Sequence, residues 1–247
     1  MESKKKSEAS TPIIYRTPLT DGPILMSTDG TFIKTTQNVA PEVIPPSSPN
    51  RNTMLQSSPS DEILTDNLIK RGLFGGAITI MLPSSFQDVS VIRQVPDNQE
   101  VYVDSLSDMS VIIELLEHEP TVSNEHCARY FFQELAAFNQ AADIVVEKEQ
   151  VMRADSDLIP SLPPAYPRCT LVGRQTVKKF SRDSLSPSPP DEIRIYLVVL
   201  RLIAVGTDLL LSLNAPLAQS SSSSLSAEDL VRATVNSLEI HNWSLFA

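Results

Sequence analysis

The chain has 247 residues, of which 41% are hydrophobic, and a formal net charge of −10 at pH 7. This charge argues against nucleic acid and anionic membranes as partners, because both are bound through basic residues, and it favours a basic protein partner. Two cysteines provide neither a disulfide framework nor a metal-ligand spacing, and no apolar run is long enough to span a bilayer, so we expect a soluble intracellular protein.

The first 66 residues differ in composition from the rest of the chain. They are rich in Ser, Thr and Pro and poor in aromatic residues, so they bury too little apolar surface to offset the entropy of ordering. We predict a disordered N-terminal arm over residues 1–66 and one folded domain over residues 67–247. A basic run at residues 4–6 is interpreted as either a nuclear import signal or a solvated charge cluster. Small apolar clusters at residues 12–15 and 24–26 are either docking motifs or parts of a loose tail.

The folded part is predicted to open with two strands joined by a turn. Alternating apolar residues indicate a strand over residues 78–82 with one buried face. A second strand over residues 100–104 would bury its two valines and expose the side chains between them, which are Glu100, Tyr102 and Asp104. Pro-Asp-Asn turn chemistry precedes this strand and places Asp97 three positions before Glu100. An acidic rim is therefore expected at this corner.

Two helices are predicted to follow. Ser107 is a plausible N-cap, and apolar residues at helical spacing over residues 109–116 predict a helix that ends before Pro120. A second helix is expected to begin at Ser123 or Asn124. Its predicted buried stripe consists of Cys127, Phe131, Leu135 and Phe138.

The rest of the domain is predicted to be mostly strands. Alternation indicates strands over residues 143–152 and 170–180, with a bulge in the second at residues 173–175. Residues 193–204 form the most apolar strand, and a tight reversal at residues 205–207 leads into its neighbour. Because both faces of this strand are apolar, we expect it at the centre of a sheet that helices cover on both sides.

The C-terminal part is predicted to close the domain. Ser226 and Asp229 resemble a capping box at the start of a last helix, and Trp243 and Phe246 are expected to dock on the core. Residues 159–167 are interpreted as a Pro-rich connector and residues 184–190 as a mobile loop.

No motif for catalysis or nucleotide binding is evident. Gly75 and Gly76 precede a strand, and no Gly-Lys-Ser/Thr sequence follows them, so they do not form a phosphate-cradling loop. His118 and His126 are separated by a proline and are interpreted as surface histidines, not as metal ligands. An acid/base role for Asp97 would require burial, which this turn does not suggest. We therefore expect no enzyme activity, no cofactor and no metal.

Three blocks follow one another in fixed order, namely an LFGGA start at residues 73–77, a DVS-x-x-R centre at residues 88–93 and a VPD-x-QEV end at residues 95–101. Together they resemble the hallmark sequence of the Ran guanine nucleotide release factors, the Mog family. The similarity continues in a Gly-x-Gln-x-Val-x-Lys pattern at residues 173–179 and an R-L-x-x-V-x-T-D run at residues 201–208.

The resemblance implies an α+β fold, a largely antiparallel β-sheet flanked by helices on both faces, as in the Mog and PsbP proteins. It implies binding to the small GTPase Ran, promotion of guanine nucleotide release, a role in nucleocytoplasmic transport and a location in nucleus and cytoplasm. We expect a monomer. The implied contacts with Ran are Asp97 and Glu100, with Asp88, Arg93 and Asp104 as weaker neighbours and Tyr102 as an aromatic anchor.

Two other interpretations remain open at the level of sequence. Composition alone would allow the acidic turn to be a solvated edge, and the partner could be a channel or a scaffold instead of Ran. A thylakoid-type structural subunit could share the fold. That subunit would require an acid-poor transit peptide, whereas the N-terminus here contains Glu2, Glu8 and Asp21.

Overall fold

The computed structural model describes residues 68–152, 158–177, 191–217 and 226–246. The predicted arm at residues 1–66, the predicted loop at residues 184–190 and the end of the strand predicted over residues 170–180 lie outside the described residues. None of the described helices is long and apolar enough to cross a membrane.

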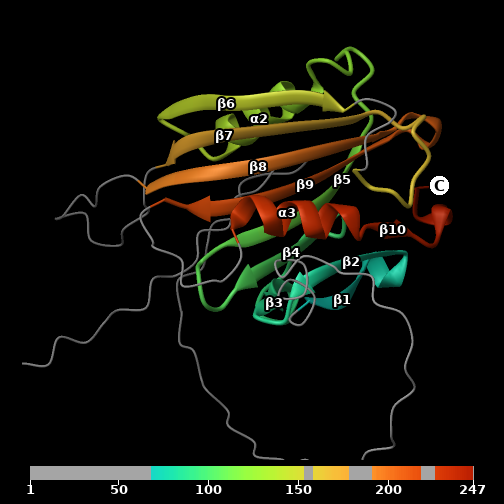
Figure 1. Ribbon diagram of the computed structural model, residues 1–247, viewed down its shortest axis with the longest axis horizontal. Helices are drawn as coiled ribbons and strands as arrows, with labels where there is room; N and C mark the ends of the chain where they lie inside the picture. The colour runs from blue at the N-terminus through green and yellow to red at the C-terminus, as the bar shows by residue number, and fades with distance from the viewer. Residues whose placement is uncertain (1–67, 153–157, 178–190, 218–225, 247) are drawn as a thin grey trace, which may run out of the picture. The chain divides into compact units, whose positions relative to one another are not determined.

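Two antiparallel sheets form the framework (Figure 1). The larger sheet has the order β3-β4-β5-β9-β8-β7-β6 and the smaller one the order β1-β2-β10. The strands of the larger sheet are β3 (Phe86–Asp88), β4 (Gln99–Asp104), β5 (Ser110–Glu117), β6 (Asp143–Met152), β7 (Arg168–Val177), β8 (Asp191–Leu202) and β9 (Thr207–Pro216). Those of the smaller sheet are β1 (Leu68–Leu73), β2 (Ile78–Pro83) and β10 (Glu239–Ile240).

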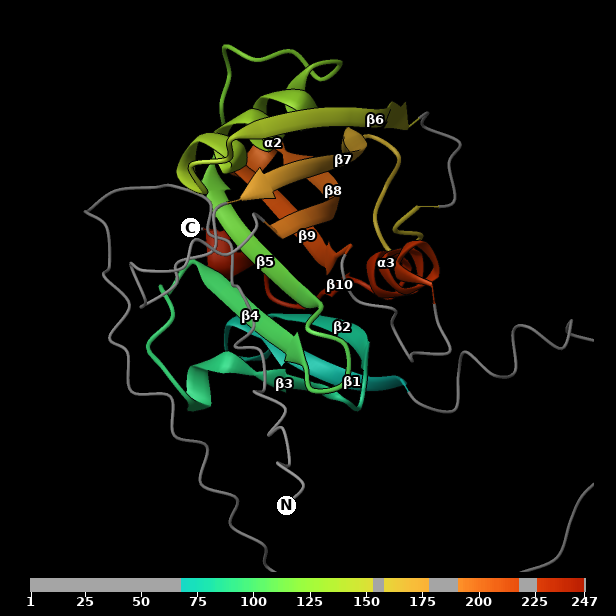
Figure 2. The ribbon, with the colours of Figure 1, turned by 90° about the vertical axis from the view of Figure 1, so that its left-hand side faces the viewer.

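The alternation along β8 explains why the two helices lie on opposite faces of the larger sheet. Ile193, Ile195 and Leu197 pack in one core cluster with α2 (Cys127–Phe138). Leu200 and Leu202 pack in another with α3 (Ala227–Asn236) and β2 (Figure 2). Since successive strand residues point to opposite faces, one apolar strand serves both layers. The predicted central strands with helices on both sides are confirmed.

α2 packs closely on β7 because position 173 has no side chain. A Cβ atom at Gly173 would lie 2.6 Å from Cζ of Phe132 and 2.8 Å from the carbonyl oxygen of Val145. The pairing of β6 with β7 shifts register between Val146 and Lys148, directly opposite Gly173. The irregularity predicted around residues 173–175 is therefore present, but β6 contributes the extra residue.

We expect Gly173→Ala to destabilise the fold by about 1 to 3 kcal/mol, because the added methyl group overpacks the contact between α2 and the sheet. Urea unfolding of the full chain measures this change. Gly72→Ala is the matched control, since its Cβ would meet the Cα of Gly76 at an ordinary 3.5 Å. Equal stability losses in the two variants would contradict the close-packing explanation.

The helix predicted over residues 109–116 is wrong, because this segment forms β5. It pairs with β4 on one side and with β9 on the other. Its apolar residues enter three different clusters: Val111 and Ile113 in one, Ile112 in a second and Leu116 in a third. A strand that is buried on both faces shows a nearly continuous apolar run, which satisfies helical spacing by coincidence.

The predicted helices α2 and α3 are confirmed, with two corrections. α2 begins at Cys127, after His126 as N-cap, and not at Ser123 or Asn124. Phe138 is exposed instead of completing the buried stripe of α2. Ser226 caps α3, since its hydroxyl accepts a hydrogen bond from the backbone N–H of Asp229 at 3.1 Å. Near the C-terminus, the ring of Trp243 stacks on Tyr166 with centroids 5.8 Å apart, and Phe246 packs against the core as predicted.

Candidate functional site

Three carboxylates form an acidic corner, which we define as Asp88, Asp97 and Glu100. Asp88 ends β3, opposite Tyr102 of β4. Asp97 is exposed in the turn before β4, which is closed by a hydrogen bond of 2.9 Å from the N–H of Gln99 to the carbonyl of Pro96. Glu100 lies half-buried on β4. The corner is therefore built from the end of β3 and the start of β4.

The carboxylate of Glu100 is held by a left-handed turn. Phe74, Gly75 and Gly76 have φ angles of 49°, 67° and 89°. The glycines adopt this region without penalty, whereas a phenylalanine there costs roughly 1 to 2 kcal/mol. The backbone N–H of Phe74 donates to Oε1 of Glu100 at 2.5 Å. This bond connects the LFGGA block to the VPD-x-QEV block across 26 positions.

The DVS-x-x-R block forms a second rigid turn beside β4. Oδ1 of Asp88 accepts from the N–H of Ser90 at 2.7 Å, and Val89 is buried against Val101 and Ile112. As a consequence, the two apolar side chains that follow Ser90 point into solvent: Val91 is 81% exposed and Ile92 is 65% exposed. An apolar tip thus lies next in sequence to the acidic corner.

Burial and a nearby charge act on the pKa of Glu100 against a hydrogen bond. Burial raises the pKa of its carboxyl group, the hydrogen bond from Phe74 lowers it, and the charge of Asp88 raises it, with a net upward shift. Within the described parts of the chain, neither Asp97 nor Glu100 takes part in an ion pair. The negative charge of the corner is therefore not neutralised by these residues.

We expect Glu100→Gln to stabilise the chain, relative to the wild type, more at pH 7 than at pH 4. A group with a raised folded-state pKa contributes stability below its unfolded pKa, and this contribution is lost as the pH rises through the folded pKa. The glutamine keeps an acceptor for the N–H of Phe74 but carries no charge. Melting temperatures of both proteins between pH 4 and pH 7 measure the effect. Parallel curves would show that burial does not disfavour the ionised carboxylate.

The predicted exposure of Tyr102 and Asp104 is wrong, since each is only 3% exposed. Tyr102 belongs to the main core cluster and lies beside the guanidinium of Arg71, and burial raises its pKa to about 12. Asp104 accepts hydrogen bonds from the hydroxyl of Ser107 and from the N–H of Leu106. Tyr102 is covered by the core and Asp104 is enclosed by the turn that follows β4, so neither residue is available to a partner. Arg93 is half-buried at the end of the second turn.

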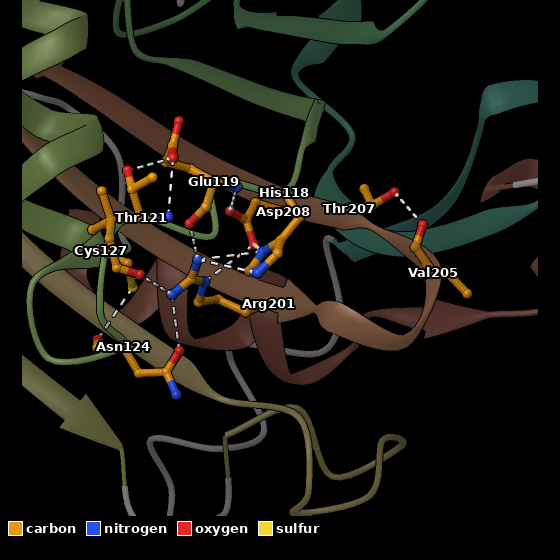
Figure 3. Close-up of polar contacts among 10 residues, drawn as sticks. His118, Glu119, Thr121, Asn124, Cys127, Arg201, Val205, Thr207 and Asp208 are labelled. Carbon is orange, nitrogen blue, oxygen red and sulfur yellow. Dashed lines mark hydrogen bonds and ion pairs between the residues drawn. The ribbon is translucent and has the colours of Figure 1, made fainter.

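A second polar cluster, the Arg201 network, lies at the β8–β9 hairpin and was not predicted. Nε of the buried Arg201 lies 3.3 Å from Oδ1 of the buried Asp208, and Nδ1 of His118 lies 2.9 Å from the same oxygen (Figure 3). The side chain of His118 is only 15% exposed, so its interpretation as a surface histidine is wrong. His126 is exposed as predicted.

The guanidinium of Arg201 also fixes the loop between β5 and α2. Its Nη2 donates to the carbonyl of Glu119 at 2.5 Å, and its Nη1 donates to the carbonyl of Val122 at 2.6 Å and to Oδ1 of Asn124 at 2.9 Å (Figure 3). The first and last residues of the R-L-x-x-V-x-T-D run, Arg201 and Asp208, therefore have a structural role. The sequence feature that could have predicted this network is an arginine within the most apolar strand, since a buried charge must be paired.

The described residues contain no group of three or more His, Cys, Asp or Glu side chains arranged to hold a metal ion. Hydrogen bonds hold the acidic corner, whereas hydrogen bonds and ion pairs hold the Arg201 network. The acidic corner is the one of the two that is open to a macromolecular partner.

Comparison with known proteins identifies the family. Residues 71–216 match the family described as Ran-interacting Mog1 protein. The chain belongs to the Ran-interacting Mog1 family. The hallmark blocks that carry the resemblance all lie within the matched segment.

The relatives of this Mog1-family chain include named release factors. The Ran guanine nucleotide release factor of Danio rerio is 34% identical over 148 residues, which cover 60% of this chain and 78% of that protein. The Homo sapiens protein of the same name is 33% identical over 70% of this chain and 94% of its own length. The crystal structure of the Saccharomyces cerevisiae Ran-binding protein Mog1p aligns with a TM-score of 0.54 and 26% identity, over 73% of this chain and 99% of that one. The predicted α+β fold is confirmed.

Proposed function

We propose that this Mog1-family chain binds Ran through the acidic corner and promotes release of its guanine nucleotide, in support of nucleocytoplasmic protein transport. Family membership supports the partner. The hydrogen bond between Phe74 and Glu100 supports the location, because it brings two hallmark blocks together at one carboxylate. Asp88 of the DVS-x-x-R block acts on the same carboxyl group through its charge. The motifs of the family thus converge on this corner.

In this proposal, Asp97 and Glu100 supply the negative charge that contacts Ran. Asp88 and Arg93 lie beside them as weaker contacts. Carboxylates that face Lys or Arg on the GTPase accelerate encounter and fix its orientation more than they add affinity. Tyr102 and Asp104 have no part in the contact, since both are buried.

The apolar anchor expected of Tyr102 is assigned instead to the tip, Val91 and Ile92. Their backbone is fixed by a hydrogen bond of 2.9 Å from the N–H of Ile92 to the carbonyl of Val89. A rigid, exposed apolar pair beside a charged rim has the composition of an interface hot spot.

Nucleotide release requires a difference in affinity between states of the partner. A protein that bound loaded and nucleotide-poor Ran equally would shift no equilibrium. The acidic corner must therefore complement the nucleotide-poor conformation better. The chain acts in this proposal as a regulator in nucleus and cytoplasm and as a monomer, without catalytic residues, a cofactor, nucleic acid or a membrane. The Ran-binding domain is assigned to residues 67–247.

Titrating the full chain into Ran loaded with a fluorescent guanine nucleotide tests the function. We expect release to accelerate with protein concentration and to saturate. Binding to Ran without accelerated release would contradict the release activity. Absence of binding to Ran in any nucleotide state would favour the alternative, a Mog-like interaction module whose partner is a channel or scaffold.

The double substitution Val91→Ser/Ile92→Ser is expected to weaken Ran binding by about tenfold, because two exposed apolar side chains would no longer be buried at the interface. Titration calorimetry with Ran measures the affinity. Leu106→Ser is the control, since Leu106 is equally exposed but lies in the turn at the other end of β4. If the two proteins bind Ran alike, the apolar tip is not the anchor.

A further inference from the structure

The two cysteines, which lie 42 positions apart in sequence, meet beneath α2. Cys127 is the first residue of α2 and Cys169 lies in β7, and both are buried in the same core cluster. Their thiols share one acceptor, because Sγ of Cys127 lies 3.3 Å and Sγ of Cys169 lies 2.8 Å from the carbonyl oxygen of Asn124. The two side chains also form a hydrogen bond with each other, so the sulfur atoms lie side by side.

Asn124 joins this thiol pair to the Arg201 network. Its carbonyl oxygen receives the thiols, while its side-chain Oδ1 receives Nη1 of Arg201 at 2.9 Å (Figure 3). The shared acceptor of both sulfur atoms thus lies in a loop that the buried Arg201 holds in place. A chance encounter of mobile side chains would not have this support.

The environment also distinguishes the two thiols. A hydrogen bond with Cys127 lowers the pKa of Cys169, and the guanidinium of Arg201 acts in the same direction. The same hydrogen bond, together with burial, raises the pKa of Cys127. Since the thiolate is the nucleophile, Cys169 is the thiol that reacts first and Cys127 the one that resolves.

We propose that Cys127 and Cys169 form a site of reversible oxidation that closes a disulfide between the start of α2 and β7. This inference is independent of Ran binding, since the pair lies in the α2 core cluster and the acidic corner lies on β3 and β4.

Hydrogen peroxide is the oxidant class that fits a buried site, because it is small and uncharged. The thiolate of Cys169 attacks one peroxide oxygen, the O–O bond breaks, and a sulfenic acid and hydroxide result. This hydroxide takes up the proton that the Cys169 thiol released on ionisation and becomes the first water. The sulfur of Cys127 then attacks the sulfenic sulfur, the S–S bond forms, and the sulfenic oxygen leaves as a second water. Two thiols are oxidised by two electrons, and one peroxide is reduced to two waters.

The crosslink would close a long loop of chain, from residue 127 to residue 169. Such a bond removes conformational freedom from the unfolded chain. The oxidised protein should therefore melt about 5 to 10 °C higher than the reduced one. The affinity for Ran should be unchanged.

The experiment treats the full chain with hydrogen peroxide and then alkylates it in denaturant. We expect a mass lower by about 2 Da, no alkylated cysteine, a crosslinked peptide that contains both residues, and reversal by dithiothreitol. Cys127→Ser and Cys169→Ser should each retain one unpaired cysteine after the same treatment and show no rise in melting temperature.

Three results would overturn the proposal: two alkylated cysteines after peroxide, sulfinic acid without a crosslink, or a disulfide that joins two chains. The wild-type mass alone decides among these outcomes, even if the serine variants fold poorly. Ran binding that is lost while the disulfide forms would count against the proposed independence of the two sites. The crosslink itself would stand.

Discussion

Asp208→Ala is expected to destabilise the fold by about 3 to 5 kcal/mol, because it leaves a buried guanidinium without its counter-charge. Asp208 is fully buried, and Arg201 and His118 both contact the same carboxylate oxygen. Oδ2 of Asp208 also accepts from the backbone N–H of Glu119 at 3.1 Å. One substitution thus removes the carboxylate that three groups contact, and the guanidinium of Arg201 among them is buried.

Equilibrium unfolding in urea measures this loss. The control is Arg232→Ala, which breaks the exposed ion pair of Arg232 with Asp229 at 2.7 Å. Exposed pairs contribute between about 0 and 1 kcal/mol, so this variant should unfold almost as the wild type does. Similar losses in both variants would show that the Arg201 network is a loose surface cluster, contrary to its observed burial.

The sequence predicted correctly those strands and helices whose buried residues recur at one regular spacing. β2 alternates cleanly, and its Ile78, Ile80 and Leu82 are fully buried as predicted. α3 carries its own capping residue. The prediction for β5 failed because both faces of this strand are buried, in different clusters, so its apolar residues do not alternate with polar ones. The β-branched run Val111, Ile112 and Ile113 was the signal that favoured a strand.

The acidic corner could be located from sequence but its geometry could not. The turn chemistry around Asp97 predicted an exposed corner, and Asp97 is exposed. The hydrogen bond between Phe74 and Glu100 joins segments that no local pattern relates. The burial of Tyr102 likewise depends on tertiary contacts, because alternation alone assigns β4 one solvent-exposed face. Asp104 is instead enclosed by hydrogen bonds with the turn that directly follows it.

The double substitution Asp97→Ala/Glu100→Ala is expected to slow association with Ran by roughly tenfold at low salt. The corner lacks neutralising ion pairs among the described residues, and the whole chain carries a net charge of −10, so its field reaches an approaching basic partner. The fold should survive, since Asp97 is exposed and Glu100 is only half-buried. Circular dichroism and melting temperature verify this.

Asp143→Ala/Glu117→Ala is the matched control. Both residues are exposed carboxylates outside the corner, on β6 and β5, so this variant loses the same total charge. It separates the general attraction of an acidic protein from a specific contact. Only the corner variant should affect binding strongly.

The most direct test is the association rate of the full chain with Ran, measured by stopped flow at two ionic strengths. We predict that the wild type associates fastest at low salt, that the Asp97→Ala/Glu100→Ala variant loses most of this advantage, and that the Asp143→Ala/Glu117→Ala variant keeps it. Equal rates and equal salt dependence for the wild type and the corner variant would show that the acidic corner does not recognise Ran.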